Sequence, residues 1–201
     1  MYALVTDNEI TKFINHPKSM VIGDVRYPAK IFSVWSASEL NAIGIYEVVF
    51  DNSNKKDEKW YINTNQSYDF DGNEVTASYG TATPKAHADT LFTAQDETDG
   101  LGTEGEVATR GLKYNLIQTL KQQVAGILSN TDWYITRNTE KSTAIPSAIS
   151  THRDAVRTKQ AQMETAITTA SDTPALETLY TNTTTDGVQS RPLGELPVLE
   201  S

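Results

Sequence analysis

The stretch Glu106-Val-Ala-Thr-Arg-Gly-Leu-Lys-Tyr-Asn-Leu-Ile-Gln-Thr-Leu-Lys-Gln-Gln-Val-Ala-Gly-Ile-Leu128 decides the second half of the fold, because the apolar residues take up helical spacing here. Apolar side chains at steps of three and four share one face of a helix. The positions that do so are Val107, Leu112, Leu116, Leu120, Val124 and Ile127. We expect one amphipathic helix of about 22 residues, which is about 33 Å long at 1.5 Å per residue.

A second helix is predicted after a break at residues 129–131. Pro146 is favoured in a first helical turn, and the pattern runs to about Ala170. Its apolar seam alternates steps of three and four: Ile149, His152, Val156, Lys159, Met163, Ala166 and Ala170. Since a strong coiled coil would not place a histidine and a lysine in its core, we expect this helix to pack against the first as an antiparallel hairpin joined by an ordered loop.

The first 82 residues have the short apolar runs and turn residues of a β-rich domain. Asp7-Asn8-Glu9 lies between two apolar runs and predicts an opening β-hairpin. Residues 36–44 start with a capping serine and end in glycine, which predicts a helix of about two turns. Alternating residues on both sides of residues 69–74 predict a second hairpin. The expected fold class is therefore α+β, a small β-rich N-terminal domain followed by a C-terminal antiparallel helical hairpin arm.

Proline, glycine and acidic residues mark the expected boundaries. Residues 83–105 contain Pro84, three glycines and an acidic cluster, and show little apolar periodicity. The prolines near the C-terminus favour extended backbone. We therefore divide the chain into a β-rich domain (1–82), a linker (83–105), a helical hairpin (106–180) and an extended tail (181–201).

Composition restricts the classes of partner. The 201 residues are only 38% hydrophobic, so some elements are expected to bury apolar faces against another chain, and a homo-oligomer is the simplest case. The net charge of −9 repels a phosphate backbone, which argues against nucleic acid. No signal peptide or membrane-spanning stretch is recognised, so we expect no membrane partner and synthesis in the cytoplasm of the producing cell.

Residues that carry chemistry do not gather into a recognisable site. Cysteine is absent, and His16, His87 and His152 lack the spacing of zinc ligands. Asp69-Phe-Asp-Gly-Asn-Glu74 has calcium-type ligands, but the same residues suit a plain hairpin turn, which we favour. The glycines of residues 100–105 lack the lysine of a phosphate loop. Spacing alone does not decide whether two of the many carboxylates form a glycan-cleaving pair. We expect no enzyme, metal or cofactor.

Two segments resemble bacteriophage tail proteins. Leu128-Ser-Asn-Thr-Asp-Trp133 leads to Arg137, and then to a proline-started helix carrying His152-Arg153 and Arg157. This pattern resembles phage tail assembly chaperone and tail-fibre-associated proteins, in which a tyrosine is usual where His152 stands. The opening hairpin, followed by Leu40-Asn-Ala-Ile-Gly-Ile-Tyr46, is similar to the start of phage tail proteins. Together the two matches cover about a third of the chain.

The resemblance implies a structural virion component of a phage tail, associated with the baseplate or a tail fibre. Its partners would be other phage tail proteins, and its location the virion tail after synthesis in the host cytoplasm. A tail-fibre assembly chaperone that leaves before the virion matures is the alternative. A fibre-borne enzyme acting on surface glycans is a third class.

The same residues have physical roles in the expected hairpin. Trp133 follows a helix end where Leu128 needs a cover, so its indole is expected to plug the open end of the helical pair. The three arginines of the segment are expected to pair with Asp132, Glu140, Asp154 or a neighbouring chain, with solvation equally open for Arg157. The residues predicted for the interface or for helix-end packing are Trp133, Arg137, Ile149, Arg153, Val156, Arg157 and Met163.

Overall fold

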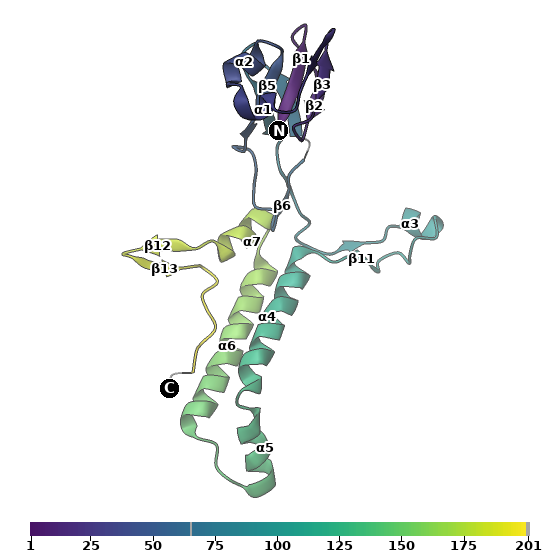
Figure 1. Ribbon diagram of the computed structural model, residues 1–201. Coiled ribbons are helices and arrows are strands. Elements are labelled where there is room, and N and C mark those ends of the chain that lie inside the picture. Colours follow the sequence, from purple (N-terminus) through teal and green to yellow (C-terminus); the bar gives the residue numbers. More distant parts are fainter. Residues whose placement is uncertain (65, 200–201) are drawn as a thin grey trace. The chain divides into compact units, whose positions relative to one another are not determined.

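The computed structural model describes residues 1–64 and 66–199. The chain forms two compact units, Met1–Thr83 and Pro84–Ser201. The first is rich in strands and the second in helices (Figure 1), which confirms the α+β prediction.

A five-stranded sheet forms the first unit, in the order β2-β1-β5-β8-β7. The pairs are antiparallel except β5 and β8, which run parallel. The sheet curls, because the rings of Phe13 on β2 and Tyr68 on β7 approach to 4.4 Å between centroids although both strands are edges. The strands are β1 (Tyr2–Thr6), β2 (Glu9–Ile14), β5 (Ile45–Asp51), β7 (Gln66–Phe70) and β8 (Val75–Tyr79).

Both predicted hairpins are present in this sheet. Asp7 and Asn8 have φ values of 53° and 64°, the left-handed geometry that a tight β1–β2 turn requires. At the β7–β8 turn, the Asp71 carboxylate accepts hydrogen bonds from the backbone N–H groups of Asn73 and Glu74, each at 2.8 Å. The Asp69 to Glu74 segment is thus a hairpin turn that uses its own carboxylate to satisfy backbone donors.

The alternating residues before the second hairpin turn, 59–68, are expected to form its first strand, and position 65 lies outside the described residues. Among the described residues of this range, β6 (Tyr61–Ile62) pairs with β9 (Thr83–Pro84), β7 pairs with β8, and Asn63 and Thr64 belong to no strand. The Asn63 side chain bonds both the N–H and the C=O of Lys56, at 2.9 Å each. These two bonds tie the loop at Lys56 to the chain just after β6.

Two apolar clusters fill the first unit. One packs the sheet against the β3–β4 hairpin and two short helices, and the other lies between the central strands. The first cluster is Ile14, Met20, Ile31, Phe32, Leu40 and Ile45, and the second is Ala3, Val5, Val48, Val75 and Ala77. The smaller elements are β3 (Met20–Ile22), β4 (Val25–Tyr27), α1 (Ile31–Val34) and α2 (Ala37–Asn41).

The predicted short helix over residues 36–44 is α2. Ser36 and Glu39 form a reciprocal capping box at its start. After the helix, Gly44 has φ +80°, and its carbonyl accepts a 2.8 Å hydrogen bond from the N–H of Val5 on β1. A Cβ at Gly44 would lie 2.5 Å from the Val5 carbonyl oxygen, so only glycine fits this crossing.

Two long helices, α4 (Leu112–Ser129) and α6 (Ser147–Thr169), dominate the second unit and lie side by side (Figure 1). They are antiparallel, because Lys113 near the start of α4 donates to the Thr168 carbonyl near the end of α6, while Arg153 near the start of α6 donates to the Leu128 carbonyl at the end of α4. The shorter α7 (Thr173–Tyr180) follows, capped by Asp172. The helical hairpin is therefore present.

Three expectations for this unit were wrong in detail. α4 begins at Leu112 rather than near Glu106, because residues just before it form β11 (Val107–Thr109), which pairs with β10 (Thr90–Leu91), and Gly111 is extended. The expected linker contains α3 (Ala94–Thr98) with a Thr93 capping box. The expected loop after residue 131 is a helix, α5 (Asp132–Lys141), with an acidic residue in its first turn as the helix dipole favours.

The expected extended tail contains one further hairpin. β12 (Thr183–Thr185) and β13 (Val188–Ser190) pair across a turn at Asp186 and Gly187, whose φ values are 53° and 78°. The Asp-Gly pair at this turn is a recognised hairpin signal, and the sequence analysis missed it. The chain after Ser190 has no regular structure as far as residue 199, which agrees with the extended backbone expected from its prolines.

Candidate functional site

An arginine joins the two long helices at the break between α4 and α5. Arg153 on α6 donates through Nη1 to the Leu128 carbonyl at 2.8 Å and to the Thr131 hydroxyl at 2.6 Å. Its Nη2 donates to the Asp132 carboxylate at 2.9 Å. The guanidinium thus adds a charged donor to the Leu128 carbonyl, which also accepts from the Thr131 N–H at 3.1 Å and from the Thr131 hydroxyl at 3.0 Å. It also pairs with Asp132, the first acidic residue of α5.

This contact is buried on the arginine side only. The Arg153 side chain is 8% exposed and that of Asp132 is 59% exposed, so solvent screens the charge pair while the hydrogen bonds to Leu128 and Thr131 stay protected. The Nε of Arg153 has no hydrogen-bond partner within the described part of the chain. Asp132 was one of the acceptors expected for this arginine, and the Leu128 carbonyl and the Thr131 hydroxyl were not foreseen.

Trp133 does not plug the helix end, so that expectation was wrong. It is 51% exposed, because Arg153 and the buried Thr131 occupy the place that the indole was expected to fill. The indole lies on the surface of α5 beside Tyr134, with ring centroids 3.7 Å apart. The Arg137 guanidinium lies over both rings, 4.7 Å from the centroid of Trp133 and 5.4 Å from that of Tyr134.

Arg137 therefore pairs with aromatic rings instead of the expected carboxylate. Among residues 1–64 and 66–199 it makes no salt bridge, and its buried Nε has no hydrogen-bond partner. Arg157, the third arginine, is more than half exposed and reaches only its helical neighbour Asp154, at 3.4 Å. Arg137 thus leaves hydrogen-bonding capacity unused beside the exposed Trp133 and the partly buried Tyr134. We call these three residues the α5 aromatic cluster (Trp133, Tyr134 and Arg137).

The apolar seam of α6 is mostly where the sequence placed it. Ile149, Val156 and Met163 are buried, and Val156 is fully buried. The seam shifts toward the C-terminal end, where Ile167 is fully buried in place of the predicted Ala166. These residues pack within the helical pair, so they serve helix packing rather than an exposed interface.

The C-terminal segment adds a feature that the sequence analysis missed. Residues 193–199, which we call the strap, lie extended along the α4–α6 pair. Leu193 is buried and its N–H donates to the Leu179 carbonyl at 3.0 Å. The sequence indicated this packing through the leucines at positions 193, 196 and 199 around one proline, because a segment that is fully in solvent is usually poor in large apolar residues.

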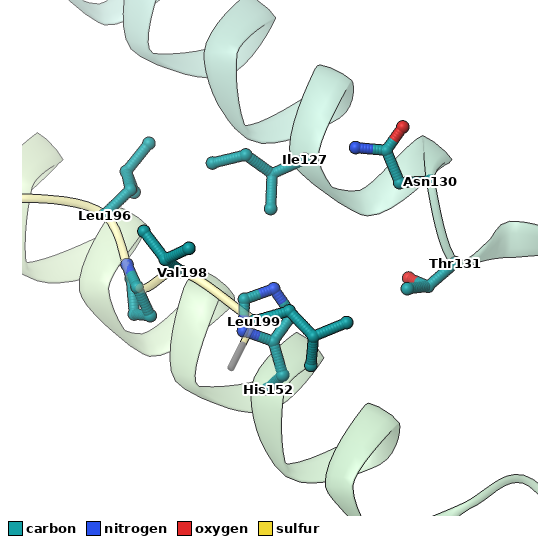
Figure 2. Close-up of a pocket in the computed structure, with 8 residues that line it drawn as sticks. Ile127, Asn130, Thr131, His152, Leu196, Val198 and Leu199 are labelled. Atoms are coloured by element: carbon teal, nitrogen blue, oxygen red, sulfur yellow. The ribbon is translucent and has the colours of Figure 1, made fainter. Parts of the chain in front are cut away.

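A cavity of about 280 Å³ lies between the strap and the two helices. Figure 2 shows residues from α4, α6 and the strap around it. His152 belongs to this lining and is 9% exposed, and its imidazole has no hydrogen bond within the described residues. The wall contains no Asp, Glu, Lys or Arg side chain, and its residues are Ile127, Asn130, Thr131, His152, Leu196, Pro197, Val198 and Leu199.

An acidic side chain secures the start of α4. Asp89 accepts hydrogen bonds from the Gly111 N–H at 2.8 Å and from Arg110 at 2.6 Å. The bond from the Gly111 backbone, followed by that from Arg110, holds the pKa of Asp89 below its usual range. The carboxylate thereby ties the base of the β10–β11 hairpin to the helix that follows it.

Comparison with models of known protein families, with curated proteins and with solved structures finds no match to this chain. In the described ranges, no helix is long and apolar enough to cross a membrane. Among the same residues no group of three or more His, Cys, Asp or Glu side chains could hold a metal ion.

Proposed function

We propose that this protein is a non-enzymatic structural component of a bacteriophage tail, associated with the baseplate or a tail fibre, that acts by docking on other tail proteins. The single observation that carries the proposal is the α5 aromatic cluster. It lies within the stretch that resembles phage tail proteins, and it exposes the residue types that dominate protein interfaces.

The chemistry of the cluster suits a protein partner. Tryptophan, tyrosine and arginine supply most hot-spot residues of protein interfaces, because rigid rings and a planar cation bind well once water is removed. Trp133 is half exposed, and Ile135 beside it is also exposed. The Arg137 guanidinium already lies over the rings, so a partner carboxylate would meet a cation that is positioned beside the aromatic side chains.

Mass spectrometry of purified virions tests the proposed location. We expect the protein in mature particles, in a fixed ratio to known tail proteins. Its absence would contradict the structural role. If its co-expression then raised the yield of soluble fibre, the tail-fibre assembly chaperone would take its place.

A variant pair tests the docking surface. Trp133→Ala with Arg137→Ala should lower incorporation into particles by more than tenfold, if about 2 kcal/mol or more of interface energy is lost. Arg110→Ala with Tyr114→Ala is the matched control, because it removes another arginine–aromatic contact, of 4.2 Å, from the same unit. Equal incorporation of the two double variants would show that the α5 aromatic cluster is not the docking surface.

A further inference from the structure

The β10–β11 hairpin carries α3 and leaves the start of α4 as an arm (Figure 1). We call residues 90–109 the acidic arm, because this range contains five acidic side chains and no basic one. Its base is fixed, since Asp89 accepts from the Gly111 N–H at 2.8 Å and the Leu112 N–H donates to the Ala86 carbonyl at 3.0 Å. An element that is already ordered loses little conformational entropy when a partner binds it.

The acidic arm has an uncovered apolar face. Leu91 and Val107 are partners in the β10–β11 register, so their side chains lie on the same side of the hairpin, and both are exposed. Leu101, which follows α3, is exposed as well. A two-stranded hairpin is only marginally stable by itself, so a partner that covers this face would stabilise the arm.

The β3–β4 hairpin of the β-rich unit has the opposite charge. Residues 18–30, which we call the basic hairpin, contain three basic residues and one acidic residue. The cations are Lys18, Arg26 and Lys30, all exposed, and none of them forms a salt bridge within the described part of the chain. Val21 and Arg26 are register partners, so an exposed apolar side chain and an exposed cation share one side of this hairpin.

Another basic segment is engaged within its own unit. Residues 110–121 contain three basic side chains and no acidic one. Arg110, however, pairs with Asp89 at 2.6 Å, and Lys113 donates to the Thr168 carbonyl at 2.8 Å. The cations of the basic hairpin, by contrast, are available to a partner.

We propose that the acidic arm of one copy of this chain docks on the basic hairpin of a second copy. Leu91 and Val107 pack against Val21, and the carboxylates of the arm face Arg26 and the neighbouring lysines. Such a contact is heterologous, because it joins two different surfaces, so a pair of copies still has one free arm and one free basic hairpin. Further copies add to the pair until a ring closes or an open chain forms.

Local charge complementarity favours this contact although the net charge of the chain is −9. Salt screens charges that are more than about 8 Å apart at physiological ionic strength, so the groups that face each other decide whether two copies attract. At the proposed contact carboxylates face cations, and the apolar side chains between them leave water. The inference is independent of the proposed tail function, because self-association is measured in buffer without any particle.

Charge reversal on each side tests the contact. The arm variant carries Asp99→Lys, Glu104→Lys and Glu106→Lys, and the hairpin variant carries Lys18→Glu, Arg26→Glu and Lys30→Glu. In size-exclusion chromatography with light scattering, the natural chain should form oligomers that grow with its concentration. Each variant alone should associate about tenfold more weakly or less, because attraction becomes repulsion at three positions.

A mixture of the two variants separates this contact from an effect of net charge. The lysines of the arm variant meet the glutamates of the hairpin variant, so a mixed complex should form, and native mass spectrometry identifies it by mass. A matched control changes the net charge as the arm variant does, at exposed positions outside both surfaces: Glu9→Lys, Glu140→Lys and Asp154→Lys. This control should associate at least as well as the natural chain.

Circular dichroism confirms that all three variants are folded. A natural chain that is monomeric at every concentration tested would overturn the proposal. So would a mixture of the arm and hairpin variants that forms no complex, or a control variant that loses association as fully as the arm variant.

Discussion

The two units bury their apolar residues with different architectures. In the β-rich unit a curled sheet encloses two clusters of buried side chains, and even the edge strands bring Phe13 and Tyr68 into contact. In the helical unit an antiparallel pair buries one stripe, relies on Arg153 at a joint, and leaves Trp133 and Val198 at the surface. A two-helix layer has few neighbours to cover its apolar faces, so part of them stays at the surface. The β-rich unit also leaves apolar side chains exposed, among them Val21, Val34 and Phe50.

The largest expected loss of stability comes from placing a charge in the apolar stripe that is buried between α4 and α6. Val156→Asp should lower the free energy of unfolding of the helical unit by about 4 kcal/mol or more, because Val156 is fully buried and the new carboxylate has no partner. Urea unfolding followed by far-UV circular dichroism measures it. Thr158→Asp, exposed on the same helix, should change little. Similar stability of the two variants would show that the α4–α6 stripe is not a core.

Removal of Arg153, which connects α6 to the break between α4 and α5, should cause the next largest loss of stability. Arg153→Ala removes the buried charged donor to the Leu128 carbonyl and the Thr131 hydroxyl, and should cost about 1.5 to 3 kcal/mol, with the exposed Asp132 adding little. The Leu128 carbonyl keeps its hydrogen bonds from the Thr131 N–H and hydroxyl, which limits the loss. Arg157→Ala is the control, because that side chain is mostly exposed. Hydrogen exchange at the amides of residues 128–134 locates the loss. Equal effects of the two changes would refute the role of Arg153.

Paired glycine substitutions contrast the two units. Gly44→Ala should destabilise the β-rich unit by about 1 to 3 kcal/mol, since the residue has φ +80° and the added Cβ would meet the Val5 carbonyl. Gly126→Ala should stabilise the helical unit by about 0.5 to 1 kcal/mol, because it lies inside α4 in open space. Thermal unfolding measures both changes, and effects of the same sign would contradict the prediction.

A small effect on stability is expected at the α5 aromatic cluster. Trp133→Ala should lower the free energy of unfolding by about 1 kcal/mol or less, because half of the indole is in solvent and its cation–π contact is surface-exposed. Chemical denaturation of the purified variant measures this. A loss of several kcal/mol would mean that the indole is buried in solution.

The smallest expected effect is a change in stability at acid pH, which arises from Asp89 at the start of α4. Asp89 has a lowered pKa, so its stabilising contribution is present above its unfolded pKa of about 4 and is lost as the pH falls through the lower folded value. Asp89→Asn should therefore be less stable than the natural chain at neutral pH, and the difference should shrink below about pH 4. A difference that stays constant from neutral to acid pH would contradict this assignment.

The sequence predicted turns and helix caps well, and it predicted contacts between distant elements poorly. The Asp7-Asn8 turn and the Ser36 cap are local signals, and each specifies its structure without help from distant residues. Val107 fitted a helical stripe by spacing, yet it pairs in a strand, because pairing with β10 depends on a residue 16 positions away.

The candidate site was only partly predictable for the same reason. Arg153 and Asp132 were recognised as a charge pair, but the joint with the Leu128 carbonyl depends on how two helices meet. The exposure of Trp133 followed from that unforeseen joint. The shift of the seam from Ala166 to Ile167 reflects the 3.6-residue period of a real helix, which drifts from a strict pattern of threes and fours.

The buried guanidinium of Arg153 also determines how far α6 is slid along α4. If α6 were displaced along α4 by one helical turn, about 5.4 Å, the two apolar stripes would still face each other. Apolar contacts alone therefore favour one alignment of the two helices only weakly over the next. Three acceptors grouped at one helix end match Arg153 in a single alignment. A polar group inside an apolar seam thus selects one register among several near-equal ones, and that choice fixes where the strap and the α5 aromatic cluster are presented.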